Sequence, residues 1–396
     1  MRGEPLSPPP AFGHADSVIT IDGGAIVENW RYLDGLSGPR TETAGVVKAD
    51  AYGLGATRIA PQLAAAGCRT FFVMSLEEAI SLRSALSGSG HDDRRIFVLG
   101  GCHAGQEREF ITSRIMPVLN SLEQLDRWRT ACAGAGQADS SLGSALHVDT
   151  GMTRLGLDPG ETAWLLRRVE QGHAPLAGAN IQLLMSHLTA GEDLLDDASD
   201  RQLASFEHLR TIIPDVPTSL ANSGGTLRGS GFHMALTRPG IALYGLHPAG
   251  LGTAGDQVAQ AASLRPAVTW QARILQRREA PAGDRVGYNG THRLTRDSRI
   301  LTLGVGYADG YPRNLGDRAT AIIAGMPAPV IGRVSMDSIT VDVTDLDADR
   351  TAAATHALIL GDGYTLARMA ADAETIGYEI LTQLGRRPAR HYVDAP

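Results

Sequence analysis

Short apolar runs alternate with helix-like stretches through the first two-thirds of this 396-residue sequence. The helix-like stretches include 76–86 (LEEAISLRSAL) and 161–169. The eight apolar runs are 44–47, 71–74, 96–99, 116–119, 145–148, 181–185, 218–221 and 241–243. Strand and helix alternating eight times favour a parallel (β/α)8 barrel. The same alternation also builds a doubly wound sheet, and periodicity alone leaves both folds open.

The pattern changes after residue 255. Short β-type runs are now separated by turn clusters such as Asn289-Gly290, and a helical pattern returns only at 364–372. These runs are 268–277, 300–305, 319–323, 330–334 and 338–343. They predict a second, mainly β domain. We therefore expect a flexible, proline-rich leader over 1–17, a (β/α)8 barrel over 18–255 and a mainly β C-terminal domain over 256–396.

Composition narrows the class of protein. The net charge of −7 argues against a nucleic-acid partner, which a basic surface would serve. The sequence has no run of 18 or more apolar residues, so we expect no membrane contact, and the first residues lack the apolar stretch of a secretory signal. Three scattered cysteines, Cys68, Cys102 and Cys132, argue against a disulfide framework and a zinc site. These features predict a cytoplasmic enzyme without a metal.

One lysine, Lys48, occurs among the 36 basic residues, and all the others are arginine. Arginine replaces lysine in most surface roles, but its guanidinium stays protonated and cannot act as an amine nucleophile. A sequence that uses arginine elsewhere should therefore keep lysine where chemistry needs an amine. Composition alone supports a catalytic lysine and a lysine placed by chance equally. The residues around Lys48 have to distinguish these explanations.

Reactive side chains follow several of the apolar runs, and the C-terminal ends of barrel strands form the active-site mouth of this fold. These residues are Lys48, Arg154, His187, Asn222 and Ser223, with Arg238, Gly240 and Ile241 leading into the last run. An amine, two guanidinium groups, an imidazole and an amide–hydroxyl pair would therefore converge on one opening. Glycine-flanked backbone near the last strands is where such barrels bind phosphate.

The residues around these positions form seven blocks in order along the chain. They are VVKADAYGLGA (46–56), HVDTGMTRLGL (147–157), MSHLTAGED (185–193), SLANSGG (219–225), TRPGIALYG (237–245), VGYADGYPR (305–313) and GRVSMD (332–337). Together they resemble the alanine racemases, a family of fold-type III enzymes dependent on pyridoxal 5′-phosphate (PLP). The resemblance extends from about residue 18 to 392 and covers both predicted domains. It implies interconversion of L- and D-alanine, with D-alanine supplied for peptidoglycan.

The resemblance implies a cofactor site on the barrel. Lys48 would bind PLP covalently and act as the base on the D-alanine side. Tyr52, Ser223 and the backbone N–H groups of Gly240 and Ile241 would hold the phosphate. Asn222 would help to fix that loop.

The resemblance also assigns the remaining site residues. Arg238 would face the pyridine nitrogen, and His187 would lie between Arg238 and Tyr307. Arg154 and the backbone N–H of Met336 would hold the substrate carboxylate and the phenolic edge of the cofactor. Tyr307 would be the base on the L-alanine side. Tyr307 and Met336 would come from the partner in a homodimer.

The implied set is chemically coherent. Racemisation removes a proton from one face of Cα and returns it to the other face, so two bases must flank the substrate. A tyrosine with an ordinary pKa near 10 is a poor base at neutral pH, and nearby cations favour its phenolate. A guanidinium at the pyridine nitrogen keeps that nitrogen unprotonated, so PLP is a weaker electron sink.

Each residue also has an ordinary structural explanation. Tyr307 lies beside Asp309-Gly310, which alone indicates a turn. His187 matches a hydrogen-bonded core histidine, the two arginines match salt-bridge residues, and Met336 matches core packing. Their joint occurrence at matching positions favours the functional explanation.

Two positions depart from the family pattern. His147 stands where many members carry a lysine, sometimes carbamylated, and no carbamate can form without that lysine. Another group, such as a bound anion, would then orient Arg154. Arg386 stands where a tyrosine often helps to bind phosphate and narrows substrate entry, so selection by substrate size is open.

Three rival functions share the fold. A diamino-acid decarboxylase needs an acidic partner at the pyridine nitrogen, which Arg238 does not supply. A non-catalytic PLP carrier resembles a lone barrel, whereas this chain adds a β domain with Tyr307 and Met336. A racemase for serine or several amino acids is compatible with Arg386.

Overall fold

The computed structural model describes residues 12–135, 142–213 and 215–395. The chain forms two compact units. Of the described residues, those within 26–249 and 253–265 form the barrel unit, and 12–25, 250–252 and 266–395 form the β unit. Residues 1–11 of the expected leader lie outside the described residues.

Parallel strands build the barrel unit, in the order β3-β4-β5-β6-β7-β8-β9, and β10 pairs with β2. Backbone hydrogen bonds from Ala235 to Thr218 (3.0 Å) and from Arg238 to Ala221 (2.9 Å) join β10 to β9. Because β2 and β3 are successive parts of one strand, these contacts close a barrel of eight strands. The strands are β2 (Glu42–Thr43), β3 (Gly45–Val46), β4 (Thr70–Val73), β5 (Arg95–Val98), β6 (Met116–Leu119), β7 (Ser144–His147), β8 (Ile181–Met185), β9 (Thr218–Ser219) and β10 (Leu236–Thr237). The expected (β/α)8 barrel is confirmed.

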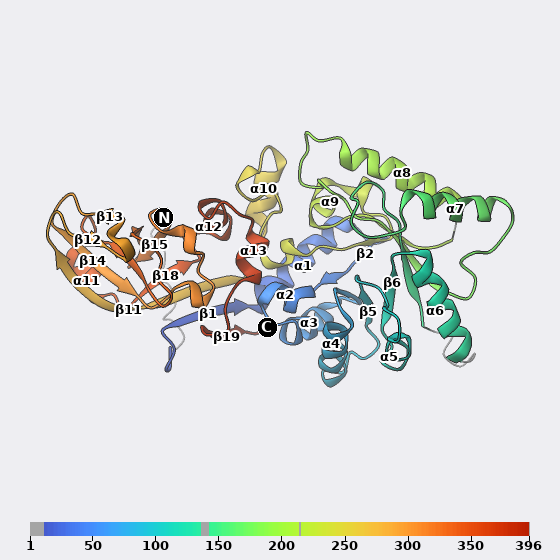
Figure 1. The fold of residues 1–396 in the computed structure, drawn as a ribbon, viewed down its shortest axis with the longest axis horizontal. Coiled ribbons are helices and arrows are strands. Elements are labelled where there is room, and N and C mark those ends of the chain that lie inside the picture. Colours follow the sequence, from blue (N-terminus) through green and yellow to red (C-terminus); the bar gives the residue numbers. More distant parts are fainter. Residues whose placement is uncertain (1–11, 136–141, 214, 396) are drawn as a thin grey trace. The chain divides into compact units, whose positions relative to one another are not determined.

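Helices follow the strands, and α3 to α6 lie on the outer side of the barrel in Figure 1. Both α4 and α7 begin with a capping box, in which a side chain before the helix and a glutamate on its first turn exchange hydrogen bonds with the backbone. The helices are α1 (Gly23–Ser37), α2 (Lys48–Gly53), α3 (Ala56–Ala66), α4 (Leu76–Gly88), α5 (Glu107–Thr112), α6 (Leu122–Ala135), α7 (Pro159–Glu170), α8 (Ala198–Ile212), α9 (Ser223–Arg228) and α10 (Asp256–Ser263), with 3-10 turns η2 (Ser230–Phe232), η3 (Ile241–Tyr244) and η4 (Gly250–Gly252).

The expected eighth strand at 241–243 is wrong. These residues form η3, and the eighth strand is β10, four to five residues earlier. A short apolar run predicts burial but does not separate a strand from a buried helical turn. All four residues of η3 are buried, and Tyr244 donates a hydrogen bond to the carbonyl of Val46 (3.0 Å).

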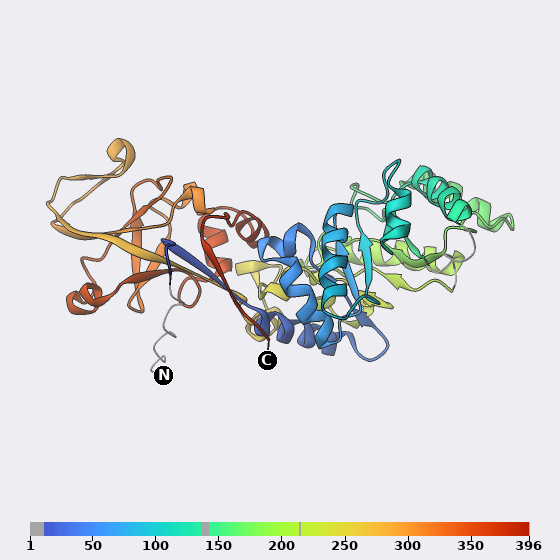
Figure 2. The same cartoon turned by 90° about the horizontal axis from the view of Figure 1, so that it is seen from below.

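The β unit is a mainly antiparallel barrel, which confirms the expected second domain. Its sheet has the order β14-β17-β16-β15-β18-β11-β1-β19, and a further pairing of β14 with β11 closes it. Figure 2 shows β1 and β19 side by side, and this pair is parallel. The strands are β1 (Ser17–Asp22), β11 (Val268–Ala280), β12 (Arg285–Val286), β13 (His292–Arg293), β14 (Ser298–Leu303), β15 (Thr320–Ile323), β16 (Met326–Ile331), β17 (Ile339–Asp342), β18 (His356–Leu360) and β19 (Ala389–Val393), with α11 (Ala348–Ala353), α12 (Leu366–Asp372), α13 (Gly377–Thr382) and the 3-10 turns η5 (Tyr288–Gly290), η6 (Tyr307–Asp309) and η7 (Arg313–Leu315).

The first described residues belong to the β unit. Strand β1 was expected in the barrel segment, but it pairs with β11 and β19. The Arg273 guanidinium lies 4.7 Å from the centre of the Phe12 ring and donates hydrogen bonds to the carbonyls of Ala15 (2.9 Å) and Gly13 (3.0 Å). The β unit therefore includes the end of the expected leader.

No described helix has both the length and the apolar character needed to cross a membrane. Within the same residues, no group of three or more His, Cys, Asp or Glu side chains is placed to hold a metal ion.

Candidate active site

Lys48 lies just beyond strand β3, in a turn with unusual backbone geometry. The four residues after it, 49–52, have φ values of 52° to 58°, in the left-handed region. This conformation costs a non-glycine residue about 1–2 kcal/mol. Hydrogen bonds offset the cost, from Ala51 N–H to Val47 O (2.8 Å) and from Gly55 N–H to Asp50 O (2.8 Å). The backbone therefore sets the direction in which the half-buried Lys48 leaves the strand.

The amine of Lys48 belongs to a cluster of cationic and imidazole groups. Burial lowers the pKa of Lys48, the Arg154 guanidinium lowers it further, and the Glu78 carboxylate opposes both. Lys48 in turn contributes to lowering the pKa of His187. The amine therefore lies within electrostatic reach of Arg154, in the loop after β7, and of His187, after β8.

Ser223, Gly240 and Tyr52 meet at the start of two short helical turns. The Ser223 hydroxyl oxygen accepts hydrogen bonds from the N–H groups of Gly240 (2.9 Å) and Ala242 (3.3 Å). A Cβ atom at Gly240 would lie 2.2 Å from the Tyr52 hydroxyl oxygen, so the phenol and the backbone approach closely. Burial raises the pKa of Tyr52, which keeps its hydroxyl as a neutral donor. Ile241 follows Gly240 as the first residue of η3.

Asn222 fixes the start of α9. Its side-chain oxygen accepts a hydrogen bond from the N–H of Gly225 (3.0 Å), and its amide nitrogen donates to the carbonyl of Leu188 (3.2 Å). The same nitrogen lies 3.5 Å from Nε2 of His187. Asn222 therefore joins the loops that follow β8 and β9.

Arg238 is buried at the end of β10. Its guanidinium donates hydrogen bonds to three neutral oxygens: Ser219 Oγ, the carbonyl of Ser186 (2.5 Å) and the carbonyl of Leu220 (3.5 Å). Burial lowers its pKa to about 9, so the group remains cationic at neutral pH. A buried cation among neutral acceptors is costly unless an anionic or polar group shares the site.

His187 is neutral at physiological pH. Burial, followed by the charge of Arg238 and then that of Arg154, lowers its pKa well below the ordinary value. The ring can therefore accept or donate a hydrogen bond without adding charge to this cationic region.

Sequence reasoning treated His147 only as a departure from a family pattern and did not identify its partner, Asn120. The Asn120 amide nitrogen donates to the carbonyls of Leu99 and Val118 (3.0 Å each), which fixes the orientation of the amide. Its oxygen then accepts from Nδ1 of His147 (2.9 Å). His147 therefore carries its proton on Nδ1, and Nε2 is left as an acceptor. Burial, with a contribution from Arg238, lowers the pKa of His147 to about 4.

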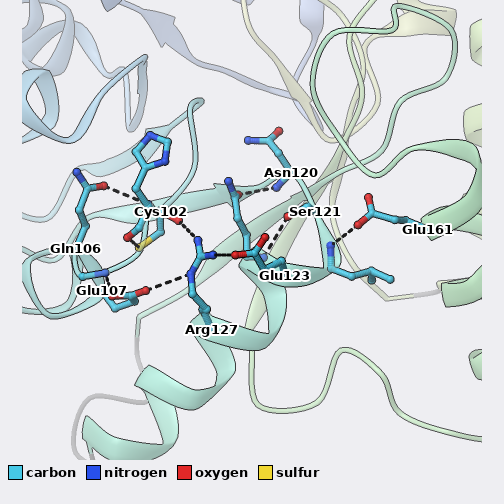
Figure 3. Close-up of polar contacts among 12 residues, drawn as sticks. Cys102, Gln106, Glu107, Asn120, Ser121, Glu123, Arg127 and Glu161 are labelled. Carbon is cyan, nitrogen blue, oxygen red and sulfur yellow. Dashed lines mark hydrogen bonds and ion pairs between the residues drawn. The ribbon is translucent and has the colours of Figure 1, made fainter.

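Figure 3 shows the hydrogen bonds and ion pairs that connect the segment of Asn120 to its neighbours. Arg127 on α6 donates to the carbonyl of Cys102 (2.7 Å) and pairs with Glu107 (3.4 Å). Glu161 on α7 accepts a hydrogen bond from the N–H of Leu122 (2.9 Å). These contacts connect the segment after β5 to α6, and the start of α6 to α7. They therefore hold the segment that carries Asn120.

Arg154 lies in the loop after β7. The Asp149 carboxylate shapes this loop by accepting hydrogen bonds from the N–H groups of Gly151, Met152 and Thr153, each 2.8 Å long. The exposed Arg154 lines a pocket of about 720 Å³ together with Asp149. This pocket extends to Leu166 on α7 and Leu209 on α8, and it is not lined by Lys48 or the other predicted site residues.

Tyr307 and Met336 lie together on the β unit. The N–H of Tyr307 donates to the carbonyl of Ser335 (3.1 Å), and that of Ala308 donates to the carbonyl of Met336 (3.0 Å). Both side chains are exposed, Tyr307 by 42% and Met336 by 51%. A Cβ at Gly306 would lie 2.3 Å from the Met336 oxygen, so glycine is needed for the two loops to meet.

The structure thus assigns the predicted site residues to two groups. The barrel unit carries Lys48, Tyr52, Arg154, His187, Asn222, Ser223, Arg238, Gly240 and Ile241 at or after its strand ends. The β unit carries Tyr307 and Met336. Sequence reasoning missed Asp309 and Arg387, which hold the turn of Tyr307, although Asp309 lies inside the quoted block VGYADGYPR.

Comparison with known proteins decides the family. Residues 21–248 match the family described as alanine racemase, N-terminal domain, and residues 267–392 match alanine racemase, C-terminal domain. The chain belongs to the alanine racemase family. The two matches cover the barrel and the β domain in the order that the sequence blocks predicted.

Members of the alanine racemase family match along nearly the whole chain. An alanine racemase of Acidiphilium cryptum is 47% identical over 94% of this chain and 97% of its own length. A catabolic alanine racemase of Agrobacterium fabrum is 41% identical over 97% and 94%. The crystal structure of the Bartonella henselae alanine racemase, with covalently bound pyridoxal phosphate, has a TM-score of 0.87 and 39% identity over 96% of this chain and 100% of that one.

Proposed function

We propose that this chain is a PLP-dependent isomerase that interconverts L-alanine and D-alanine, with Lys48 binding the cofactor. The supporting observation is the position of the chain's single lysine, in a left-handed turn at the end of β3 beside other predicted site residues. A costly backbone conformation persists only where surrounding contacts determine it, and such conformations cluster at active sites.

The residues around Lys48 fit a cofactor that carries a phosphate. Arg154 and Lys48 act on one another electrostatically, and Arg238 is buried among neutral oxygens, so the region has an excess of positive charge. A bound anion would offset that excess. The neutral Tyr52 hydroxyl, the Ser223 hydroxyl and the backbone N–H of Ile241 suit the phosphate oxygens. The Gly240 N–H, which donates to Ser223 Oγ here, would join them by turning from that oxygen.

PLP, when bound, delocalises the electron pair that remains on the substrate Cα after deprotonation. The protein then has to remove and return one proton on opposite faces. Lys48 acts as the base on the D-alanine side, as the family resemblance implies, and the lowered pKa of its amine favours the neutral form that such a base needs. Tyr307 takes the L-alanine side.

Further groups on the chain hold the substrate and tune the site. Arg154 and the backbone N–H of Met336 bind the substrate carboxylate. Arg238 would face the pyridine nitrogen as a cation, and His187, a neutral ring, would lie between Arg238 and Tyr307 of the partner subunit. His147 stands where many family members carry a lysine, sometimes carbamylated, and either its Nε2 acceptor or a bound anion orients Arg154. An experimental density map at His147 and Arg154 separates these two arrangements.

The active form is a homodimer in which the partner subunit supplies Tyr307 and Met336. Their exposure supports this, because a large tyrosine and methionine side by side on a surface suit an interface. Full activity in a demonstrated monomer would exclude the shared site.

We further propose that the enzyme works in the cytoplasm and supplies D-alanine for peptidoglycan. The free cysteines Cys68, Cys102 and Cys132 support a reducing compartment. Growth of a D-alanine auxotroph carrying this gene, without added D-alanine, tests the biosynthetic role.

The experiment that tests the reaction is conversion of L-alanine by the purified protein with PLP, with L-serine and L-lysine in parallel. D-alanine formation that Lys48→Arg abolishes supports the proposal. Loss of the carboxyl group from lysine would indicate the decarboxylase. Serine inversion with no effect on alanine would indicate the serine racemase that Arg386 leaves open. PLP binding without Cα exchange in deuterated water would indicate a carrier.

A further inference from the structure

Glu78 belongs to a different helix from Lys48, yet its carboxylate contacts the turn that follows Lys48. Glu78 lies on the first turn of α4, where it completes the capping box with Ser75. Its Oε2 accepts hydrogen bonds from the N–H groups of Met74 (2.7 Å) and Ser75 (3.4 Å). Its Oε1 accepts a hydrogen bond from the N–H of Ala49 (2.7 Å).

Only the Oε2 contacts belong to the helix cap. A capping box needs the glutamate to reach back to the residue before its own helix, which Oε2 does. The Oε1 contact joins α4 to a turn 29 residues earlier in the chain. Ala49 is the first residue of the left-handed run and directly follows Lys48. The Glu78 carboxylate therefore holds the peptide unit between Lys48 and Ala49.

The charge of Glu78 also affects the protonation of the Lys48 amine. The groups that act electrostatically on the Lys48 amine are Arg154, from the loop after β7, and Glu78, from α4. Arg154 disfavours the protonated amine and Glu78 favours it. The amine also faces His187, whose own pKa is lowered well below the ordinary value, so that ring is neutral. Glu78 is thus the acidic group that sets the charge balance at the amine.

We propose that Glu78 is a positioning residue for Lys48, which fixes its turn through Oε1 and places one negative charge beside its amine. The inference rests on the proposed role of Lys48 in binding the cofactor. A glutamate that only caps α4 would have the Oε2 contacts and would leave the amine unaffected.

Because the chain has a single lysine, the pKa of its side-chain amine can be measured without an activity assay. In the full-length chain freed of cofactor, an amine-acylating reagent can modify Lys48 and the chain's N-terminal amine, and peptide mass spectrometry separates the two. The rate of Lys48 modification as a function of pH gives the pKa of its amine. The reagent reacts only with the neutral form.

Three variants distinguish the effects of the length of the Glu78 side chain, its charge and the N-terminal cap of α4. Glu78→Gln removes the charge and offers one oxygen to three N–H groups, so it loses either the Ala49 contact or the contacts with Met74 and Ser75. We expect it to lower the Lys48 pKa by about one unit. Glu78→Asp keeps the charge but is one methylene too short for Ala49, and we expect a lower kcat for alanine with a smaller pKa change. Ser75→Ala removes the other half of the cap, and we expect a lower Tm with an unchanged Lys48 pKa.

The outcomes that overturn the inference are distinct from those that overturn the function. If Glu78→Gln and Glu78→Asp both keep the wild-type pKa and kcat, Glu78 does not position Lys48. If Ser75→Ala changes the Lys48 pKa as much as Glu78→Gln does, the effect belongs to the helix cap and the inference fails. If Glu78→Gln does not fold, the comparison of Glu78→Asp with Ser75→Ala still tests whether Glu78 positions Lys48. A Lys48→Arg variant that retains racemase activity would instead overturn the proposed function.

Discussion

Arg387 binds both carboxylate oxygens of Asp309, with Nε 2.6 Å from Oδ1 and Nη2 2.7 Å from Oδ2. Asp309 is 2% exposed, and its Oδ2 also accepts the N–H of Gly306 (2.9 Å). Nη2 of Arg387 lies 3.4 Å from the carbonyl of Met336 as well. One guanidinium therefore holds the turn of Tyr307 and the loop of Met336, so the geometry of the proposed second base depends on a residue near the end of the chain.

The Arg387→Met variant should lose both stability and activity. Removing the guanidinium leaves the buried Asp309 carboxylate without its charged donors, at a cost of about 1–3 kcal/mol. The turn of Tyr307 should loosen, so kcat should fall more than KM rises. Thermal unfolding and alanine racemisation measure the two effects. The matched control is Arg296→Met, which breaks the exposed pair with Asp345 in the same unit and should change neither quantity. Equal behaviour of the two variants would contradict the role of Arg387.

Gly240→Ala should weaken binding of the phosphate group. The new methyl would lie 2.2 Å from the Tyr52 hydroxyl oxygen and 3.1 Å from its Cζ, so the phenol has to move. We expect PLP affinity to fall by at least tenfold, measured by titrating the cofactor-free chain and following absorbance. The clash should also lower the Tm of Gly240→Ala, and the double variant Gly240→Ala with Tyr52→Phe, which removes the closest contact, should recover part of that loss. Absence of any recovery would show that the clash is not with the hydroxyl.

Alternation and residue type predicted repeated β/α units, a mainly β second domain and reactive residues at the strand ends, but the choice of a barrel over a doubly wound sheet also needed the family resemblance. It placed the eighth strand wrongly, since the burial of Ile241 and Tyr244 in a 3-10 turn produces the same apolar run as a strand. The Asp309–Arg387 and Asn120–His147 pairs were missed for another reason. Each joins residues far apart in the chain, and no local pattern specifies such a partner.

His147 should make the fold sensitive to mild acid. Burial lowers its pKa from 6.5 to about 4 in the folded chain. Between these two values the unfolded chain binds a proton that the folded chain does not, so stability falls as pH falls from 6.5 towards 4. The loss is at most about 3 kcal/mol for this one group.

Denaturant unfolding at several pH values measures the slope of the free energy of unfolding against pH. His147→Gln should be less stable at pH 7 and should have a shallower dependence between pH 6.5 and 4. The exposed His173 provides the control, because His173→Gln should keep the wild-type slope. A His147→Gln slope as steep as the wild type would assign the acid sensitivity to other groups, among them His187, whose pKa is also lowered.

Mixing two inactive variants should restore activity if the site is shared between subunits. Lys48→Arg removes the cofactor amine, and Tyr307→Phe removes the second base. In a mixed dimer, one site combines Lys48 of the Tyr307→Phe chain with Tyr307 of the Lys48→Arg chain, so that site is intact. Equal mixing after dissociation and reassociation gives mixed dimers in half of the molecules, with one active site of two. We therefore expect about a quarter of wild-type activity. A site completed within one chain would give no recovery, because every chain in the mixture would then lack one of the two bases.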